Sequence, residues 1–365
     1  MRLNPLTAKK LRRFRSIKRG YYSFLLLAFL LVVSLFGELL VNSRALVVRH
    51  DGKWHFPAYG AIIPGDTFGL GYRYETDYRE LREKYRAKNA ASGAAAGKNW
   101  LLMPPLCTFN AYENSPYEGV FKPAPPSWLG GPAGHLLGTD TTGRDIFARL
   151  FYAFRIAMLF SLAFVLCTYL IGIAIGCAMG YLGGGVDLFG QRLIEIWSNI
   201  PFLYTVIIIA SVIPDSTGIQ MRIAILLLVL VAFSWTGMTY YMRTATYKEK
   251  ARDYTAAAIV LGAGAGRVIF SHILPNTIST IVTFVPFTVV SAVTSITALD
   301  FLGFGFPPPT PSMGELLKQG TQTLTTAPWI VISAFSSLVV VLTLVTFIGE
   351  AVREAFDPRK FTLYK

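Results

Sequence analysis

Apolar residues along the chain gather into six long runs, separated by segments of mixed or polar character. The runs lie at about residues 21–41, 153–179, 195–213, 223–240, 277–299 and 329–349. A helix needs roughly 20 apolar residues to cross the hydrocarbon core of a bilayer. The pattern therefore predicts an all-α integral membrane protein with six transmembrane helices.

The first run has a strongly basic start, which both secretory signal peptides and membrane anchors share. A signal peptide has a shorter apolar core and a small-residue cleavage site. Here the run is long and is followed by Asn42, Ser43 and Arg44. An uncleaved transmembrane helix is therefore the favoured interpretation.

A polar region at residues 42–149 separates the first two runs and predicts a mixed α/β insert. Residues 47–56 read as a hairpin, because Asp51 and Gly52 form a dipeptide typical of tight turns. Residues 76–88 read as a charged helix with opposite charges four positions apart. In the second apolar run, Gly172, Gly176 and Gly180 form a small-residue face that permits close helix packing.

Composition agrees with a membrane location. The chain has 365 residues, of which 53% are hydrophobic, and a mean hydropathy of +0.47. A soluble domain of this length is less apolar and more charged.

The net charge of +13 is concentrated before the first run, in Arg2, Lys9, Lys10, Arg12, Arg13, Arg15, Lys18 and Arg19. An excess of Lys and Arg marks cytoplasmic segments, so residues 1–20 are predicted to be cytoplasmic. Binding of anionic membrane lipid is a lesser alternative. Nucleic-acid binding is disfavoured, because these cations flank a membrane segment and are not interleaved with stacking aromatic residues.

Six spans return the C-terminal tail, residues 351–365, to the cytoplasm and place region 42–149 outside. The same count puts the loop at 241–276 inside, and this loop and the tail carry many cations: Arg243, Lys248, Lys250, Arg252, Arg267, Arg353, Arg359, Lys360 and Lys365. The short outer loops hold only Arg222 and Lys318. This bias fits the assignment.

Motifs for common catalytic and metal chemistries are missing from the sequence. Three cysteines give no disulfide framework, and Cys107 reads as a free thiol or a packing residue. The four histidines are scattered, so no metal-ligand spacing is seen. There is no phosphate-binding Gly-x4-Gly-Lys-Ser/Thr loop, nucleophile elbow or His-Glu-x-x-His pair. The chain is therefore expected to be a non-catalytic subunit that binds no cofactor itself.

The loop from Asp253 to Asn276 is rich in small residues and lies between two apolar runs. Asp253 can cap a short helix at its N-terminus. Gly262 permits a bend that other residues resist. Pro275 is expected to end the loop and orient the next span. Small side chains at Ala257 and Ala258 would let a partner surface approach closely.

This segment resembles the Glu-Ala-Ala loop of binding-protein-dependent ABC transporter permeases. Ala256, Ala257, Ala258, Gly262, Leu274 and Pro275 fall at the family spacing, with Ala256 in place of the Glu and His272 at the first position of the ending. The resemblance implies that the element sits in a cleft of a cytoplasmic ATPase. The residues predicted for coupling are Asp253, Tyr254, Ala256, Ala257, Ala258, Gly262, Arg267, His272, Leu274 and Pro275. The alternative is an ordinary connecting helix.

Three further blocks are similar to the peptide-permease branch of the family. The first contains Asp140, Gly143, Arg144, Asp145, Arg149 and Arg155. Asp140 and Asp145 favour a helix start, and Arg149 and Arg155 can extend along the outer interface; an interfacial anchor helix is the alternative. The second runs from Gly183 to Pro201; Asp187 and Arg192 are expected to pair locally, with contact to an ATPase as the alternative. The third follows the fifth span and includes Asp300.

Ionisable residues near membranes are functional candidates. Glu38, Glu195, Glu350 and Asp300 all lie near the ends of runs, where headgroup water lowers their cost, so most are expected to be structural. Glu195 and Asn199, on one face of the third span, are the best candidates to line a polar path.

The resemblance implies the type I importer permease fold and covers nearly the whole chain. Region 42–149 and the ending 348–358 look like the second permease of the microcin C / oligopeptide importer. The implied partners are a homologous permease in a heterodimer, two subunits that bind ATP and Mg, and a periplasmic peptide-binding protein, in a bacterial inner membrane. Alternatives are an importer of dipeptides, nickel or another solute, an ion-coupled secondary transporter, or a membrane-anchored scaffold protein.

Overall fold

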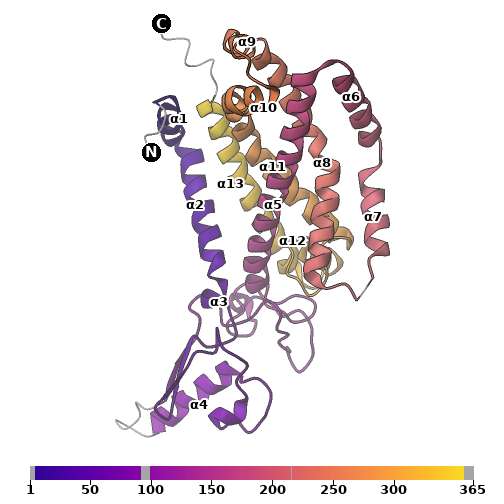
Figure 1. Cartoon of the computed structure of the whole chain (residues 1–365). Coiled ribbons are helices and arrows are strands. Elements are labelled where there is room, and N and C mark those ends of the chain that lie inside the picture. The colour runs from indigo at the N-terminus through magenta and orange to yellow at the C-terminus, as the bar shows by residue number, and fades with distance from the viewer. Residues whose placement is uncertain (1–4, 92–98, 215, 357–365) are drawn as a thin grey trace. The chain divides into compact units, whose positions relative to one another are not determined.

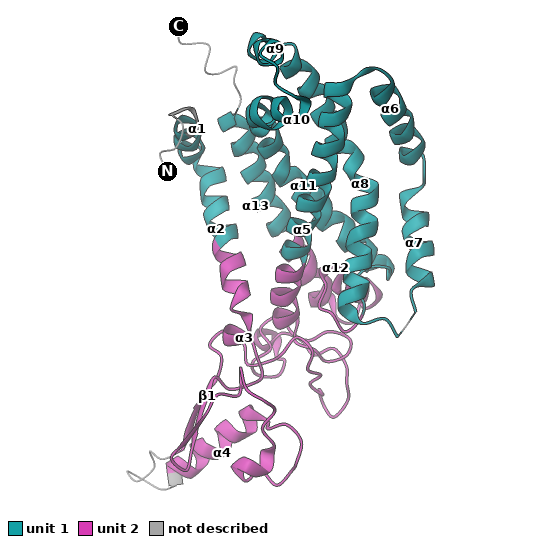
Figure 2. Ribbon diagram, in the orientation of Figure 1, with its two compact units in different colours: residues 1–28, 157–307, 339–365 teal, residues 29–156, 308–338 magenta. Residues whose placement is uncertain are grey.

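The computed structural model describes residues 5–91, 99–214 and 216–356, and the chain divides into two compact units (Figure 2). Unit 1 comprises residues 1–28, 157–307 and 339–365; unit 2 comprises residues 29–156 and 308–338. Three helices contribute residues to both units: α2 (Lys18–Leu35), α5 (Ile146–Leu182) and α13 (Pro328–Phe356). The last part of the expected tail, 357–365, lies outside the described residues.

Unit 1 is helical (Figure 1). Besides its parts of the shared helices it contains α1 (Pro5–Ser16), α6 (Gly184–Ser198), α7 (Phe202–Val212), α8 (Ile219–Lys250), α9 (Asp253–Val260), α10 (Ala265–Arg267), a π-helical segment (Val268–Ile273) and α11 (Leu274–Leu302). Within the described ranges, five helices are long and apolar enough to cross a membrane, and α6 with α7 makes a sixth if this bent pair is one span. The expected membrane fold is confirmed.

The third span differs from the continuous helix expected at 195–213. Helices α6 and α7 are inclined at 71° to each other. Pro201 precedes α7 in an extended conformation, with ψ of 104°. Proline lacks an N–H and restricts the residue before it, so the first helix ends at this point. The first span also differs, because α2 ends at Leu35 and the short helix α3 (Gly37–Leu40) follows.

Close packing of α5 on α8 follows from the glycines of the second span. A Cβ atom on Gly172 would lie 2.7 Å from Met238 Cβ, and one on Gly176 would lie 2.6 Å from the Thr239 carbonyl oxygen. A Cβ on Gly180 would lie 2.7 Å from the Arg243 carbonyl oxygen. Only glycine allows the two backbones to approach so closely, as the spacing of four predicts.

Unit 2 contains a small antiparallel sheet in the order β2-β1-β3. Its elements are α3, β1 (Val47–His50), β2 (Lys53–His55), α4 (Tyr78–Ala91), β3 (Trp100–Leu102) and α12 (Met313–Gln322), with 3₁₀ turns at Gly65–Phe68 and Ser127–Leu129. The expected hairpin is confirmed, and both turn residues have positive φ, 46° at Asp51 and 83° at Gly52. Val48, Phe68, Tyr78 and Leu81 form a buried cluster in this unit.

One end of unit 1 gathers four chain segments. Helices α1, α9 and α10 and the C-terminal part of α13 lie together there (Figure 2). The link between α7 and α8 lies at the opposite end of the same unit (Figure 1). The end with α9 is therefore the one that carries the basic residues of α1.

Candidate functional site

The loop singled out by its small residues projects from unit 1 as a short helix and a turn (Figure 1). Ala256, Ala257, Ile259, Val260 and Leu261 are all exposed. Val260 and Leu261 are 86% and 87% exposed. Apolar side chains presented this fully next to a stretch of alanines form a narrow surface that a groove in another protein can enclose.

Hydrogen bonds at the base of α9 hold the helix to its neighbours. The Thr255 hydroxyl, which is buried, donates to the Glu249 carbonyl at 2.8 Å. The Tyr254 hydroxyl donates to the Glu249 carboxylate at 2.5 Å and accepts from the Asn276 amide at 3.2 Å. These contacts link the end of α8 to the start of α11 through α9, so displacement of α9 would reach both long helices. This set of contacts could not be predicted from the sequence, because its members are spread over 28 positions.

The N-terminal cap of α9 differs from the expectation. Arg252 occupies the N-cap position and makes no side-chain cap bond, and Asp253 lies in the first turn. There its carboxylate still interacts favourably with the positive end of the helix dipole. Asp253 therefore supports the helix start without capping it.

Gly262 forms the bend that its residue type predicts. Its φ is +83°, and no other atom lies within 4 Å of where a Cβ would be. Its N–H donates to the Ile259 carbonyl at 2.9 Å, and the Ala263 N–H donates to the Ala258 carbonyl at 3.0 Å. This pair of bonds is the Schellman arrangement, which ends a helix with one left-handed residue. Glycine is needed here for its backbone angle and not for space.

Pro275 does not end the loop as expected. The backbone stays helical from Ala265 to Leu302, and Pro275 sits in the first turn of α11, just after the π-helical segment. A proline within a helix lacks a donor and its ring crowds the carbonyl four residues earlier. The wider π turn, which contains His272, relieves that crowding, as π segments do at irregular points in helices. Leu274 opens α11, and Arg267 closes α10 and is exposed.

Behind the loop, an ion pair joins α6 to α8. The Arg243 guanidinium donates to Asp187 Oδ2 at 2.7 Å, and Gln191 donates to the same oxygen at 2.9 Å. Asp187 therefore does not pair with Arg192 as expected; Arg192 binds Glu195 at 2.6 Å. Asp187 and Arg243 are 56 positions apart, so local sequence spacing could not predict that they pair.

In unit 2, the block before α5 forms a buried ionic cluster with α12. We use "ionic cluster" for Asp140, Arg144, Arg149 and Glu315. Arg149 is 0% exposed, so it does not extend to an interface as expected. Its guanidinium donates to Glu315, and its Nε lies 3.5 Å from Asp140 Oδ2. Arg144 donates to Asp140 at 2.9 Å and to Glu315 at 3.2 Å.

Gly143 and Asp145 shape the chain around this cluster. Gly143 has φ of +82°, and a Cβ there would lie 2.4 Å from the Ser115 carbonyl oxygen. The Asp145 carboxylate accepts the Ala148 N–H at 2.7 Å and thereby caps α5 as expected. It also lies 2.8 Å from His135 Nδ1. The remaining member of the predicted set, Asp300, belongs to unit 1, where it accepts the Phe306 N–H at 2.6 Å.

The sequence from residue 172 to residue 362 matches the family model described as "Binding-protein-dependent transport system inner membrane component". The chain belongs to this family. Its members supply the membrane component of transport systems, so the fold described above is that of a type I importer permease, and the loop around α9 lies inside the matched segment.

Similar proteins carry related names. An inner membrane ABC transporter permease protein YejE of Escherichia coli K12 is 39% identical over 98% of this chain and 99% of its own length. A peptidoglycan transport system permease protein YejE of Agrobacterium fabrum is 35% identical over 98% and 94%. The dipeptide transport system permease protein DppC of Haemophilus influenzae is 32% identical over 73% and 90%. The two YejE proteins therefore also match the region between α2 and α5.

The permease places Glu195 and Asn199 differently from the expected single helical face. Glu195 lies in α6 and pairs with Arg192, and both side chains are exposed. Asn199 follows α6 as its C-cap residue, and its amide donates to the Glu195 carbonyl at 2.8 Å. Both residues thus sit at the bend of the third span, and their role in a path stays a prediction.

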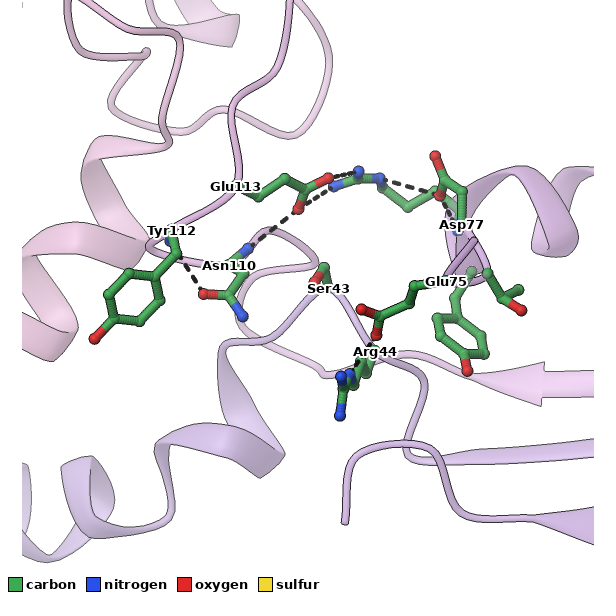
Figure 3. A pocket seen from close by; sticks show the side chains of 10 residues that line it. Ser43, Arg44, Glu75, Asp77, Asn110, Tyr112 and Glu113 are labelled. Carbon is green, nitrogen blue, oxygen red and sulfur yellow. Dashed lines mark hydrogen bonds and ion pairs between the residues drawn. The ribbon is translucent and has the colours of Figure 1, made fainter. Parts of the chain in front are cut away.

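The polar region of the permease contains a hollow of about 340 Å³ (Figure 3). Two ion pairs form part of its wall, Arg44 with Glu75 at 2.5 Å and Arg79 with Glu113. Asp77 caps α4 by accepting the Arg79 N–H at 2.9 Å. The hollow is polar and its charges are largely paired, so it suits a polar contact and not an apolar one.

Metal chemistry finds no support in the described part of the permease, which contains no group of three His, Cys, Asp or Glu side chains placed to hold an ion. The free thiols Cys107 and Cys177 are buried, and Cys167 is half-buried.

Proposed function

We propose that this permease is one subunit of an ATP-driven importer that moves peptides from the periplasm to the cytoplasm. The exposed tip of α9 carries the proposal, because Val260 and Leu261 are almost fully exposed in a chain whose family works with partner proteins. The α9 loop would sit in a cleft of an ATPase subunit. The chain itself binds no cofactor, and ATP and Mg belong to two partner subunits.

The contacts of α9 suggest how motion of an ATPase would reach the membrane spans. Movement of an ATPase cleft would displace α9, and the Glu249–Tyr254–Asn276 contacts would carry the displacement to α8 and α11. The permease states must differ in affinity for the ATPase if ATP is to shift them. Charge indicates which side of the membrane α9 faces. The end of unit 1 that contains α9 also contains the basic helix α1, and an excess of Lys and Arg marks the cytoplasmic side, so this end faces the cytoplasm.

Peptide is the proposed cargo because the similar DppC protein is named for dipeptide transport and other relatives for oligopeptide transport. The Agrobacterium relative is named for peptidoglycan transport, which adds peptide-bearing cell-wall fragments as a second cargo class. The narrower expectation of a microcin C-like cargo belongs to the same proposal. Uptake of labelled oligopeptides, dipeptides and cell-wall peptides in a strain lacking the chain separates these cargoes; unchanged uptake of all three argues against the proposal.

A photo-crosslinking residue in place of Leu261 tests the docking step. In membranes holding the complete transporter, it should link to the ATPase subunit, and nucleotide should change the yield. The same residue in place of Val212 is the control, because Val212 is also exposed and is the last residue of α7, and the link between α7 and α8 lies at the end of unit 1 opposite α9 (Figure 1). Crosslinks from position 261 to lipid alone would remove the proposed role.

Gly262→Pro tests coupling itself. Proline cannot adopt the positive φ of this residue, so α9 would lose its fixed orientation while the spans stay intact. The ATP hydrolysed per peptide imported should rise steeply, with normal amounts of permease in the membrane. Normal uptake in this variant would count against coupling through α9. A C-terminal reporter should give a cytoplasmic signal.

The periplasmic peptide-binding protein is proposed to dock on region 42–149, with a homologous permease completing a heterodimer in the membrane. The hollow in this region offers Glu75 and Asp77, both partly exposed, as polar contacts. Ser43→Trp would fill the hollow, whose wall includes Ser43. Retention of the binding protein by the full-length complex should fall. Arg73→Trp adds the same bulk at an exposed position elsewhere, and an equal loss there would count against docking at the hollow.

A further inference from the structure

Helix α1 is a basic element that the proposed transport cycle does not use. It spans Pro5–Ser16 and carries five cations, Lys9, Lys10, Arg12, Arg13 and Arg15, without any acidic residue. Lys18 and Arg19 follow at once in the first turn of α2. Such a density of one sign on a short helix needs an opposite charge nearby or it is repulsive.

The position of α1 fixes its depth relative to a membrane. Only Ile17 separates it from α2, a candidate membrane span that begins at Lys18. The helix must therefore lie within a few residues of the hydrocarbon boundary, at the level of lipid headgroups. Leu11 is 44% exposed on this helix, so an apolar side chain is also available to the acyl boundary.

Contacts with α11 and α13 hold α1 and the first turn of α2 in place within unit 1. The Lys10 ammonium donates to the Ser279 hydroxyl at 2.5 Å and lies 5.0 Å from the centre of the Phe356 ring. Arg19 pairs with Glu350 at 3.1 Å. Gly20 packs so closely that a Cβ there would lie 2.1 Å from Ala351 Cβ. With Lys10 turned inward, α1 has a defined outer face.

The outer face is cationic. Arg12 and Arg15 are exposed, as is Lys18 at the start of α2. Each Lys or Arg near an anionic leaflet strengthens membrane attachment by a roughly constant factor. We propose that the outer face of α1 is a docking surface for anionic phospholipid headgroups of the leaflet from which α2 enters the membrane.

Binding of fluorescent phosphatidylglycerol to the full-length permease in detergent tests this surface, with fluorescent phosphatidylcholine as the uncharged comparison. The wild type should prefer phosphatidylglycerol, and added salt should weaken the preference. Arg12→Gln/Arg15→Gln/Lys18→Gln should weaken phosphatidylglycerol binding by about a hundredfold, because each of the three cations contributes about fivefold. At equal ionic strength, set with sodium chloride, inorganic phosphate should weaken binding no more than chloride does, since the surface takes a headgroup within a lipid aggregate.

Lys53→Gln/Arg73→Gln/Arg86→Gln is the matched control, because it removes three exposed cations from unit 2. It should leave the lipid preference unchanged. If the α1 triple variant fails to accumulate, Arg12→Gln and Arg15→Gln singly should each weaken binding about fivefold. The proposal is overturned if the α1 variants keep the preference, if the control loses it equally, or if inorganic phosphate displaces the lipid more effectively than chloride at the same ionic strength.

Discussion

The α9 loop and the ionic cluster place their side chains in environments opposite to those that residue type alone suggests. In the loop, Val260 and Leu261 are almost fully exposed. In the cluster, Arg149 has no exposed surface. An apolar tip gains little from the rest of its own chain, and the proposed docking to a partner would account for its identity. A buried charge contributes only as one member of a complete set, so its identity is set by the fold.

Removing one charge from the ionic cluster is the sharpest test of this contrast. Glu315→Gln would remove one of the two carboxylates that Arg149 and Arg144 share, and Asp140 alone would then face two buried guanidiniums. Breaking a buried pair in this way costs about 3–5 kcal/mol. Thermal unfolding of the purified permease, together with its abundance in the membrane, measures the loss.

Glu195→Gln is the control for that variant. Glu195 pairs with Arg192, and the two side chains are 46% and 70% exposed. An exposed pair contributes about 0–1 kcal/mol. If both variants unfold at the same temperature, the ionic cluster does not stabilise unit 2 and the contrast fails.

Two glycines with nearly equal backbone angles compare the regions directly. Gly143, beside the ionic cluster, has φ of +82°, and Gly262, at the loop, has φ of +83°. Gly143→Ala adds left-handed strain of about 1–2 kcal/mol. It also forces a Cβ against the Ser115 carbonyl oxygen, at about 1–3 kcal/mol for overpacking. The unfolding free energy should fall by about 2–5 kcal/mol, measured by denaturant titration.

Gly262→Ala adds the same strain but meets no neighbour, so its cost is about 1–2 kcal/mol. The loop can open without unfolding the spans, and the thermal midpoint should barely move. Limited proteolysis after α9 should become faster, and peptide uptake should fall. Compared with Gly262→Ala, Gly262→Asn should recover part of the resistance to proteolysis and part of the peptide uptake, because Asn tolerates positive φ. Equal loss of global stability at positions 143 and 262 would remove the distinction.

The sequence predicted those features that depend on local residue type or on periodicity. Six apolar runs predicted the spans, the glycines of α5 predicted close packing, and Gly262 predicted its own bend. Within the loop, the cap at Asp253 and the stop at Pro275 were wrong, and the coupling role of its residues stays a prediction. Both errors came from assigning a residue its commonest role without knowing where the neighbouring helix begins.

Partners that are distant in the chain could not be predicted. Arg149 finds Glu315 after 166 positions, and Asp187 finds Arg243 after 56. No periodic signal joins such pairs, because tertiary packing alone decides which charges meet. The break in the third span could have been predicted, because a proline such as Pro201 inside an apolar run ends or kinks a helix near the preceding residue.

The smallest expected effect concerns Cys107 in unit 2. Its labelling tests whether the region around it is buried, without a substitution at this position. Its thiol is buried and lies 3.7 Å from Asp145 Oδ1. Burial, reinforced by the charge of Asp145, raises the pKa of Cys107 to about 12 from an ordinary 9.0. The thiolate is the reactive form. At about pH 8, maleimide should therefore modify this thiol only after unfolding, whereas a cysteine from Ala87→Cys, exposed on α4, should react at once.

The same raised pKa sets the sign of a pH effect. Between about pH 9 and pH 12 the unfolded chain loses the Cys107 proton while the folded chain keeps it. The unfolded state then binds fewer protons, so the unfolding free energy falls as pH rises, by about 1.4 kcal/mol per pH unit at most. Cys107→Ala removes this contribution and should flatten the alkaline side of the stability curve. Rapid labelling of Cys107 in the native permease would instead show that the surroundings of this thiol are open to solvent.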